Sequence, residues 1–130
     1  MLWDPIRNCW VAQTPEEEVR QKLIQTMIGP LGYPKSLLSV EKQLPGVDRR
    51  FDLVCFTPGN GGLIPLLLIE CKAGPIDLAA ERQVLGYNDS VQAPFVCLVN
   101  GSEIRTLWRE RGKIASIPFL PSYAQLVEKR

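Results

Sequence analysis

The feature that most constrains the fold is an almost continuous apolar run at residues 63–69, which ends in Glu70-Cys71-Lys72. A strand with one face in water alternates polar and apolar residues, whereas a continuous run is typical of a central strand covered on both faces. Pro65 interrupts the run, which is far too short to span a bilayer. We therefore expect residues 63–72 to form the central strand of a sheet flanked by helices.

The first helix is marked at both ends. Thr14 is a suitable N-cap, Pro15 suits the first helical position, and a carboxylate stands three residues after the cap. Gly29-Pro30 stops the helix, so it should span about residues 15–28. It carries one apolar stripe for packing on the sheet: Val19, Leu23, Ile24, Met27 and Ile28.

The remaining patterns predict an α/β fold with a mixed sheet. We expect strands at residues 37–44, 49–56 and 95–99, an outer strand at 103–109, a loop at 58–62, a helix at 77–88 and a short helix after residue 121. The order implies a strand, helix, strand crossover. Alternation within 49–56 assigns side chains to two faces: Phe51, Leu53 and Cys55 to one, and Asp52, Val54 and Phe56 to the other.

Length and composition favour one globular domain over residues 1–130, with an irregular segment at about 1–13 and no room for a second domain. The four cysteines stand singly, without zinc-ligand spacing or disulfide-framework density. Asp4 and Pro5 precede any apolar stretch, so no signal peptide is expected. A reducing, cytoplasmic setting follows.

The net charge of +1 is too small for a protein that holds nucleic acid by phosphate neutralisation alone. Basic residues at Arg49-Arg50 and between Arg105 and Lys113 either converge on one face or form an ordinary solvated surface, which is the commoner case. Any DNA binding should therefore be local or assisted by a partner.

The absence of histidine excludes a His-based metal site, a Ser-His triad and a Cys-His pair. Asp52 and Glu70 remain as oxygen ligands for a hard cation such as Mg²⁺, with the Cys71 backbone carbonyl as a third. Glu70 and Lys72 stand two apart on a strand and project from the same face. There Lys72 can lower the pKa of an attacking water or neutralise charge on a phosphate. A structural salt bridge of Asp52 with Lys72 or Arg50 explains the same residues equally well.

An ordered set of segments resembles the PD-(D/E)XK nucleases, and more specifically the N-terminal nuclease domain of type I restriction enzyme R subunits and its stand-alone relatives. The matching segments are Thr14-Pro15-Glu16-Glu17-Glu18-Val19-Arg20-Gln21, Gly32-Tyr33-Pro34, Val40-Glu41, Arg50-Phe51-Asp52-Leu53-Val54, Ile69-Glu70-Cys71-Lys72-Ala73, Gln83 with Tyr87-Asn88, and Ala93-Pro94-Phe95 through Asn100-Gly101. The resemblance implies a restriction-endonuclease-like core and a role in restriction-modification.

The resemblance also implies residue roles. Asp52 and Glu70 would be metal ligands and Lys72 the catalytic lysine. Glu17 would reach the metal directly or through water, and Gln83 would orient near the lysine and the phosphate. The two acids beside Glu17, namely Glu16 and Glu18, more simply complement the helix dipole, and core packing is the more frequent role for Tyr87.

Two departures limit the resemblance. No GxxxxGK[ST] phosphate loop occurs, so ATP-driven translocation is not expected, and Gly74 stands where relatives commonly have proline. The resulting hypothesis is a Mg²⁺- or Mn²⁺-dependent DNA endonuclease that acts alone or is delivered by a protein partner, with a homodimer left open. The alternatives are a non-catalytic DNA- or protein-binding module on a nuclease scaffold, and a structural salt-bridged core in a dimer.

Overall fold

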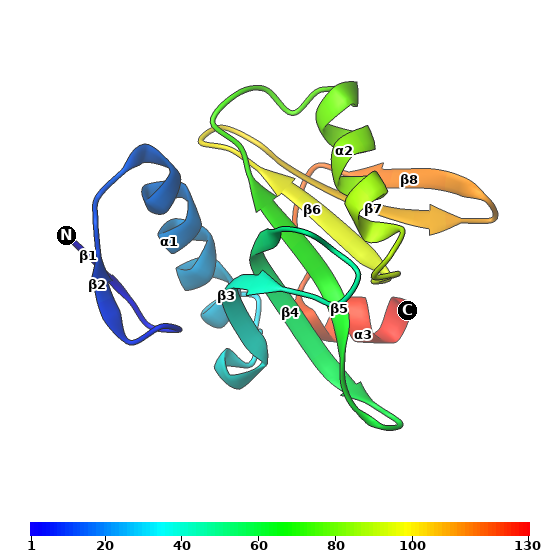
Figure 1. Cartoon of the computed structure of the whole chain (residues 1–130), viewed down its shortest axis with the longest axis horizontal. Coiled ribbons are helices and arrows are strands. Elements are labelled where there is room, and N and C mark those ends of the chain that lie inside the picture. The colour runs from blue at the N-terminus through cyan, green and yellow to red at the C-terminus, as the bar shows by residue number, and fades with distance from the viewer.

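The computed structural model describes residues 1–130 and contains a six-stranded mixed sheet beside a separate two-stranded hairpin (Figure 1). The sheet has the order β3-β4-β5-β6-β7-β8, with β3 Leu38–Gln43, β4 Arg50–Gly59, β5 Gly62–Cys71, β6 Phe95–Val99, β7 Ile104–Glu110 and β8 Lys113–Ile117. The hairpin consists of β1 Leu2–Asp4 and β2 Cys9–Val11. The helices are α1 Pro15–Ile28, α2 Leu78–Asn88, α3 Tyr123–Lys129 and a short 3-10 helix, η1 Lys35–Leu37.

The apolar run does form a central strand. β5 lies between β4 and β6, and residues 66–70 are all buried. β5 and β6 are parallel and are joined by α2, whereas every other pair in the sheet is antiparallel. The crossover and the mixed sheet are therefore confirmed. None of the helices has the length and apolarity needed to cross a membrane.

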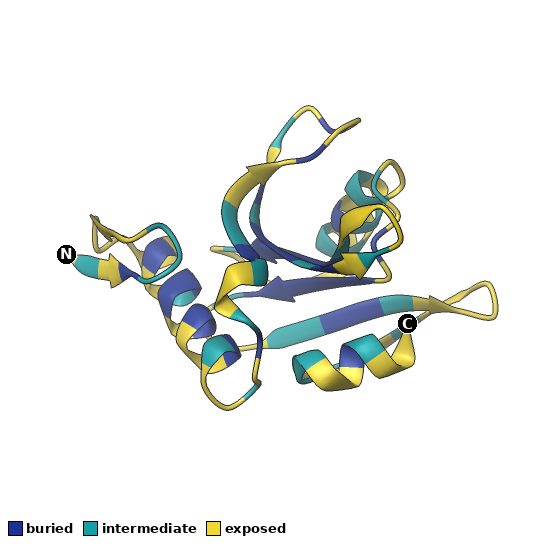
Figure 2. Ribbon diagram, turned by 90° about the horizontal axis from the view of Figure 1, so that it is seen from below, coloured by how far each residue is buried: buried dark blue, intermediate teal, exposed yellow.

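Two apolar clusters cover the two faces of the sheet, because side chains alternate along its inner strands. On β6, Cys97 belongs to a cluster with residues of α1 and α3, whereas Val96 and Leu98 belong to a cluster with Val84 of α2. Figure 2 shows α2 and α3 on opposite sides of the buried strands. The stripe expected on the first helix is confirmed, since Leu23, Ile24 and Met27 are buried and Val19 and Ile28 pack against them.

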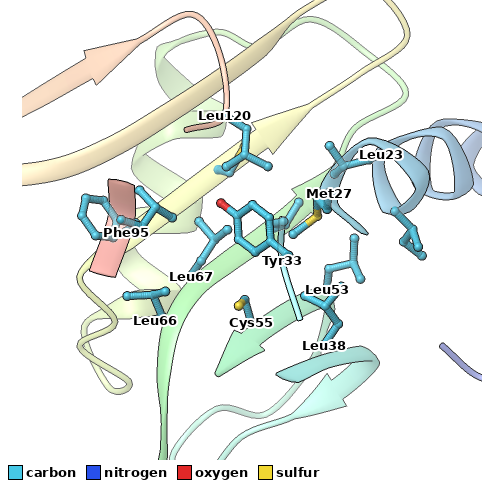
Figure 3. Packing of buried hydrophobic residues seen from close by; sticks show 14 of the residues in the cluster. Leu23, Met27, Tyr33, Leu38, Leu53, Cys55, Leu66, Leu67, Phe95 and Leu120 are labelled. Atoms are coloured by element: carbon cyan, nitrogen blue, oxygen red, sulfur yellow. The ribbon is translucent and has the colours of Figure 1, made fainter. Parts of the chain in front are cut away.

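Tyr33 joins the segment after α1 to the C-terminal segment. Its ring lies among apolar side chains from α1 and the sheet, including Met27, Leu53 and Leu67 (Figure 3). Its hydroxyl donates a hydrogen bond of 2.7 Å to the Pro121 carbonyl, and its ring meets Tyr123 edge-on. The turn predicted at Gly32-Tyr33-Pro34 therefore also anchors α3 against the core.

The structure corrects the expectations for three segments of the chain. The segment at residues 1–13 is not irregular, because β1 and β2 pair there in register. The strand predicted at 103–109 is not the outer one, since β8 pairs along it. Arg111 and Gly112 both have positive φ, which is the geometry of a tight hairpin turn. The loop expected at 58–62 is also shorter, because β4 runs to Gly59 and β5 starts at Gly62.

Capping of α3 gives a first testable expectation. The Ser122 hydroxyl accepts from the Gln125 backbone N–H at 3.2 Å, and the Gln125 side chain accepts from the Ser122 backbone N–H. Replacing Ser122 by alanine removes one half of this capping box and should lower the free energy of unfolding by about 1 kcal/mol, measured by urea denaturation. Ser36→Ala, at an exposed serine in η1, is the matched control and should change little. Equal stabilities of the two variants would contradict the expectation.

Candidate functional site

Asp52 and Glu70 are joined across β4 and β5 by a reciprocal pair of hydrogen bonds. The Cys71 backbone N–H donates to Asp52 Oδ2 at 2.7 Å, and the Asp52 backbone N–H donates to Glu70 Oε1 at 3.3 Å. Each carboxylate therefore takes a backbone donor from the strand that carries the other. This arrangement fixes both acids at the end of the central strand, where the sequence places Lys72.

The direction of Asp52 differs from the simple alternation expected along residues 49–56. β3 and β4 pair Val40 with Leu53 and Lys42 with Phe51, but the intervening pair is missing from the ladder, and Glu41 there has φ 52°. Phe51 packs in the cluster that contains Val84 of α2, here called the α2-side cluster, whereas Leu53 packs in the cluster that contains residues of α1 and α3. The assignment of both residues to one face is therefore wrong. The Asp52 carboxylate turns toward Cys71 N and to within 3.8 Å of Arg20 on α1.

Glu70 lies in an environment that disfavours its charge. The residue is only 4% exposed, and burial together with the neighbouring Asp52 carboxylate raises the pKa of Glu70 to about 7. The Arg49 guanidinium opposes this shift, since its Nη2 donates to Glu70 Oε2 at 2.7 Å. Glu70 therefore depends on nearby positive charge to remain ionised in neutral solution.

Lys72 follows β5 directly and is held at both ends. Its backbone N–H donates to the Val99 carbonyl at 2.7 Å, and its ammonium donates to Gln83 Oε1 at 2.8 Å. Gln83 comes from α2, whose N-cap Asp77 accepts from the Ala80 N–H at 2.9 Å. The crossover after the central strand thus brings Gln83 to the lysine, as the resemblance implies.

A depression of about 360 Å³ opens beside these groups. It is lined by residues from the start of α1, from β3, from β4 and from the end of β5: Thr14, Glu16, Glu17, Arg20, Glu41, Asp52, Cys71, Lys72 and Ala73. Asp52, Lys72 and Glu17 therefore share one solvent-accessible space. Glu70 is not among the lining residues, because it is buried against Arg49 and the Asp52 backbone.

Glu17 faces inward, unlike its exposed neighbours Glu16 and Glu18, but it is fully occupied. Its carboxylate accepts from Arg20 at 2.6 and 2.9 Å, from Arg7 at 2.8 Å and from Gln21 at 3.2 Å. Hydrogen bonding to Arg20, with the donors from Gln21 and Arg7, lowers the pKa of Glu17 to about 2. The structure thus places Glu17 beside the depression as the centre of an ion-pair network.

The salt bridge of Asp52 with Lys72 or Arg50, considered above as an alternative, does not form, and other arginines approach the two acids. Neither Lys72 nor Arg50 pairs with Asp52; instead Arg20 approaches Asp52, and Arg49 binds Glu70. No group of three or more Asp, Glu, His or Cys side chains lies close enough to hold a metal ion by itself. The described site therefore offers two carboxylates, each near one arginine, rather than a complete cage of acids.

Sequence reasoning assigned no role at the site to Arg7, Arg20 or Arg49, although it noted Arg49-Arg50 as a basic pair. Arg20 and Glu17 are three apart on α1, which is a spacing that brings side chains together on a helix. This spacing could have predicted the pairing of Arg20 with Glu17 from the sequence. Arg7 and Arg49, in contrast, reach Glu17 and Glu70 only through the tertiary fold. Tyr87 makes two kinds of contact. Its ring packs against the α2-side cluster, and the ring centre lies 4.2 Å from Cζ of the Arg49 guanidinium.

Comparison with known proteins agrees with the resemblance. The chain matches the family described as the type I restriction enzyme R protein N terminus over residues 15–121. Neither the curated proteins nor the solved structures include a significant match. The matched region holds every element from α1 to β8 and leaves out the β1–β2 hairpin and α3. The chain therefore belongs to the family of type I restriction enzyme R protein N-terminal domains.

Proposed function

We propose that this domain is a PD-(D/E)XK-type nuclease that hydrolyses DNA phosphodiester bonds with Mg²⁺ or Mn²⁺ at Asp52 and Glu70. The observation that carries the proposal is the reciprocal hydrogen bonding of these two acids across β4 and β5. It brings two buried or half-buried carboxylates together at the end of a strand that continues directly into Lys72. Family membership supports the same assignment.

The donor set suits a hard cation. Mg²⁺ is usually held by one or two carboxylates, completed by waters and substrate phosphate oxygens, and does not need a cage of acids. Asp52 and Glu70 supply the carboxylates, and the Cys71 backbone carbonyl belongs to the same strand end. The raised pKa of Glu70 is the condition that a nearby cation relieves. A bound cation would polarise the phosphate and lower the pKa of a coordinated water.

The chain's own side chains then have distinct tasks. Lys72 lines the same depression as Asp52, so its ammonium is close enough to stabilise the negative charge that develops on a phosphate bound there. Gln83 acts on Lys72 through their 2.8 Å hydrogen bond and is a positioning residue. Glu17 is assigned to the Arg7 and Arg20 network. The net charge of +1 favours delivery to DNA by a partner over tight binding alone.

A second candidate is a non-catalytic module that keeps the nuclease scaffold to bind DNA or a protein. The contacts of Arg20 with Asp52 and of Arg49 with Glu70 favour it, because each acid already has a cationic neighbour. Calorimetric titration separates the two candidates. A scaffold should show no Mg²⁺ or Mn²⁺ binding that depends on Asp52 and Glu70.

Removing the metal is the direct test of the proposed function. Purified protein incubated with supercoiled plasmid should convert it to nicked or linear forms in Mg²⁺ or Mn²⁺ and leave it intact in EDTA, because the proposed reaction needs a cation to polarise the phosphate and to lower the pKa of the attacking water. The measurement is the rate of plasmid conversion on agarose gels. Asp52→Asn protein, purified in parallel, reports contaminating nuclease. Cutting at the same rate by this variant would refute the assignment.

A further inference from the structure

Arg49 is bound to Glu70 in a way that leaves much of its hydrogen-bonding capacity unused. The Arg49 side chain makes two hydrogen bonds, and Nη2 donates both of them, to Glu70 Oε2 at 2.7 Å and to the Arg50 carbonyl at 3.4 Å. Its Nε is buried and has no partner. A guanidinium carries five N–H donors in a planar fork, so this side chain can take a second acceptor without losing its fit to the first.

The guanidinium is held at the site by more than Glu70. It lies 4.2 Å from the centre of the Tyr87 ring and 5.8 Å from that of Phe51, which are stacking distances for a cation over an aromatic face. Tyr87 stands one turn beyond Gln83 on α2. Arg49 also keeps 31% of its side chain exposed, against 5% for Glu70. The positive charge would therefore stay beside the site, within reach of solvent, if Glu70 took another partner.

A divalent cation on Glu70 changes the electrostatic balance for Arg49. The buried carboxylate would then be neutralised by the metal, and the guanidinium would face a like charge. A guanidinium fork matches the oxygens of a phosphate as well as those of a carboxylate, and a DNA substrate would bring phosphates to this site. We propose that Arg49 exchanges partners, binding Glu70 in the metal-free protein and a DNA backbone phosphate when a divalent cation occupies Glu70. This inference rests on the proposed function and extends it to the substrate.

The first experiment measures Mg²⁺ affinity without DNA. Arg49→Gln removes the charge that competes with the cation, so calorimetry at pH 8.5 should show Mg²⁺ binding about tenfold tighter than in the parent protein. Arg111→Gln makes the same change in the β7–β8 turn, where the residue is exposed, and should leave the affinity unchanged. If Arg49→Gln is unfolded without metal, saturating Mg²⁺ should restore its native circular dichroism, because the cation replaces the guanidinium as the partner of Glu70.

The second experiment measures the salt dependence of binding to a DNA duplex. A Lys72→Ala background slows cleavage enough for binding to be measured on intact DNA. In that background, Arg49→Gln should reduce the magnitude of the slope of log K against log salt by about 0.9 in Mg²⁺, which corresponds to one lost phosphate contact. In EDTA the slope should not change, because Arg49 then remains on Glu70. Arg111→Gln in the same background should show no difference between Mg²⁺ and EDTA.

Three results would overturn the exchange. They are an unchanged Mg²⁺ affinity in Arg49→Gln, a slope that responds equally in Mg²⁺ and EDTA, and an unfolded Arg49→Gln that Mg²⁺ does not restore. If the parent protein cuts DNA while Arg49→Gln gives any of these results, the exchange fails and the proposed function stands. If neither protein binds Mg²⁺ and the parent does not cut DNA, both fail. Tighter binding in Arg49→Gln with no cutting by the parent supports the exchange and removes the proposed function.

Discussion

Lys72→Ala is expected to slow DNA cleavage by about 10²- to 10³-fold, which is the usual loss when one group that stabilises transition-state charge is removed. Lys72 lines the depression together with Asp52, and Gln83 accepts a hydrogen bond of 2.8 Å from its ammonium, whereas the other lysine or arginine there, Arg20, is paired with Glu17. Alanine leaves the β5 backbone and its bond to the Val99 carbonyl in place. The measurement is the single-turnover rate on a DNA duplex at saturating Mg²⁺, which separates chemistry from product release.

The control is Lys113→Ala at the start of β8, where the side chain is exposed at the far edge of the sheet. It should cleave at the parental rate. Mg²⁺ affinity, measured by calorimetry, should not weaken in Lys72→Ala, because the carboxylates stay and a repelling charge is lost. A Lys72→Ala protein that cuts as fast as the Lys113→Ala control would remove Lys72 from the reaction and leave only a structural role.

The elements that sequence reasoning predicted well are those whose signal is local. The run at residues 63–69 carries its burial on both faces within one segment, and this was enough to identify a central strand. The Thr14 and Asp77 caps mark the starts of α1 and α2, where each side chain accepts from a backbone N–H three residues later. Asp52 and Glu70 were predicted as neighbours because their strands follow one another in the chain.

The direction of the Asp52 side chain depends on the backbone conformation of Glu41 on the neighbouring strand β3. Residues 49–56 alternate well enough to suggest a regular strand, but Glu41 on β3 adopts φ 52° and the pairing opposite Asp52 is lost. Non-glycine residues in this conformation are uncommon and occur at functional sites more than elsewhere. Nothing in the β4 sequence reveals the interruption. Simple alternation therefore placed Phe51 on the same face as Leu53, which is wrong, and treated Asp52 as part of a regular ladder.

The short hairpin strands were missed for a statistical reason. β1 and β2 contain three residues each, too few to establish a period of two. What holds the hairpin to α1 is a buried polar contact, since Asp4 is fully buried and accepts from Gln21 and Arg7. A buried carboxylate near the N-terminus is not readable as such from a sequence. The same limitation hid Arg49, whose partner lies 21 residues along the chain.

Glu17→Gln is expected to lower the free energy of unfolding by about 2 to 3 kcal/mol at pH 7. Breaking a buried ion pair by removing one partner typically costs about 3 to 5 kcal/mol, because a buried charge is left uncompensated. Here Arg7 keeps Asp4, and Arg20 keeps Glu41 at 3.6 Å, so the loss should fall below that range. Urea denaturation measures it, with Glu18→Gln, an exposed neighbour bonded only to Gln13, as the matched control.

The pH dependence separates this structural role from the metal-ligand role that the resemblance implies. The pKa of Glu17 falls from an ordinary value of 4.5 to about 2 on folding, so its contribution is fully present above pH 4.5 and declines as the pH drops toward 2. The stability gap between parent and Glu17→Gln should therefore be constant from pH 7 to 5 and narrow by pH 3.5. A Glu17→Gln protein as stable as the parent at pH 7, but with weaker Mg²⁺ binding, would instead make Glu17 a ligand. The Arg7 and Arg20 contacts would then have to open before the cation binds.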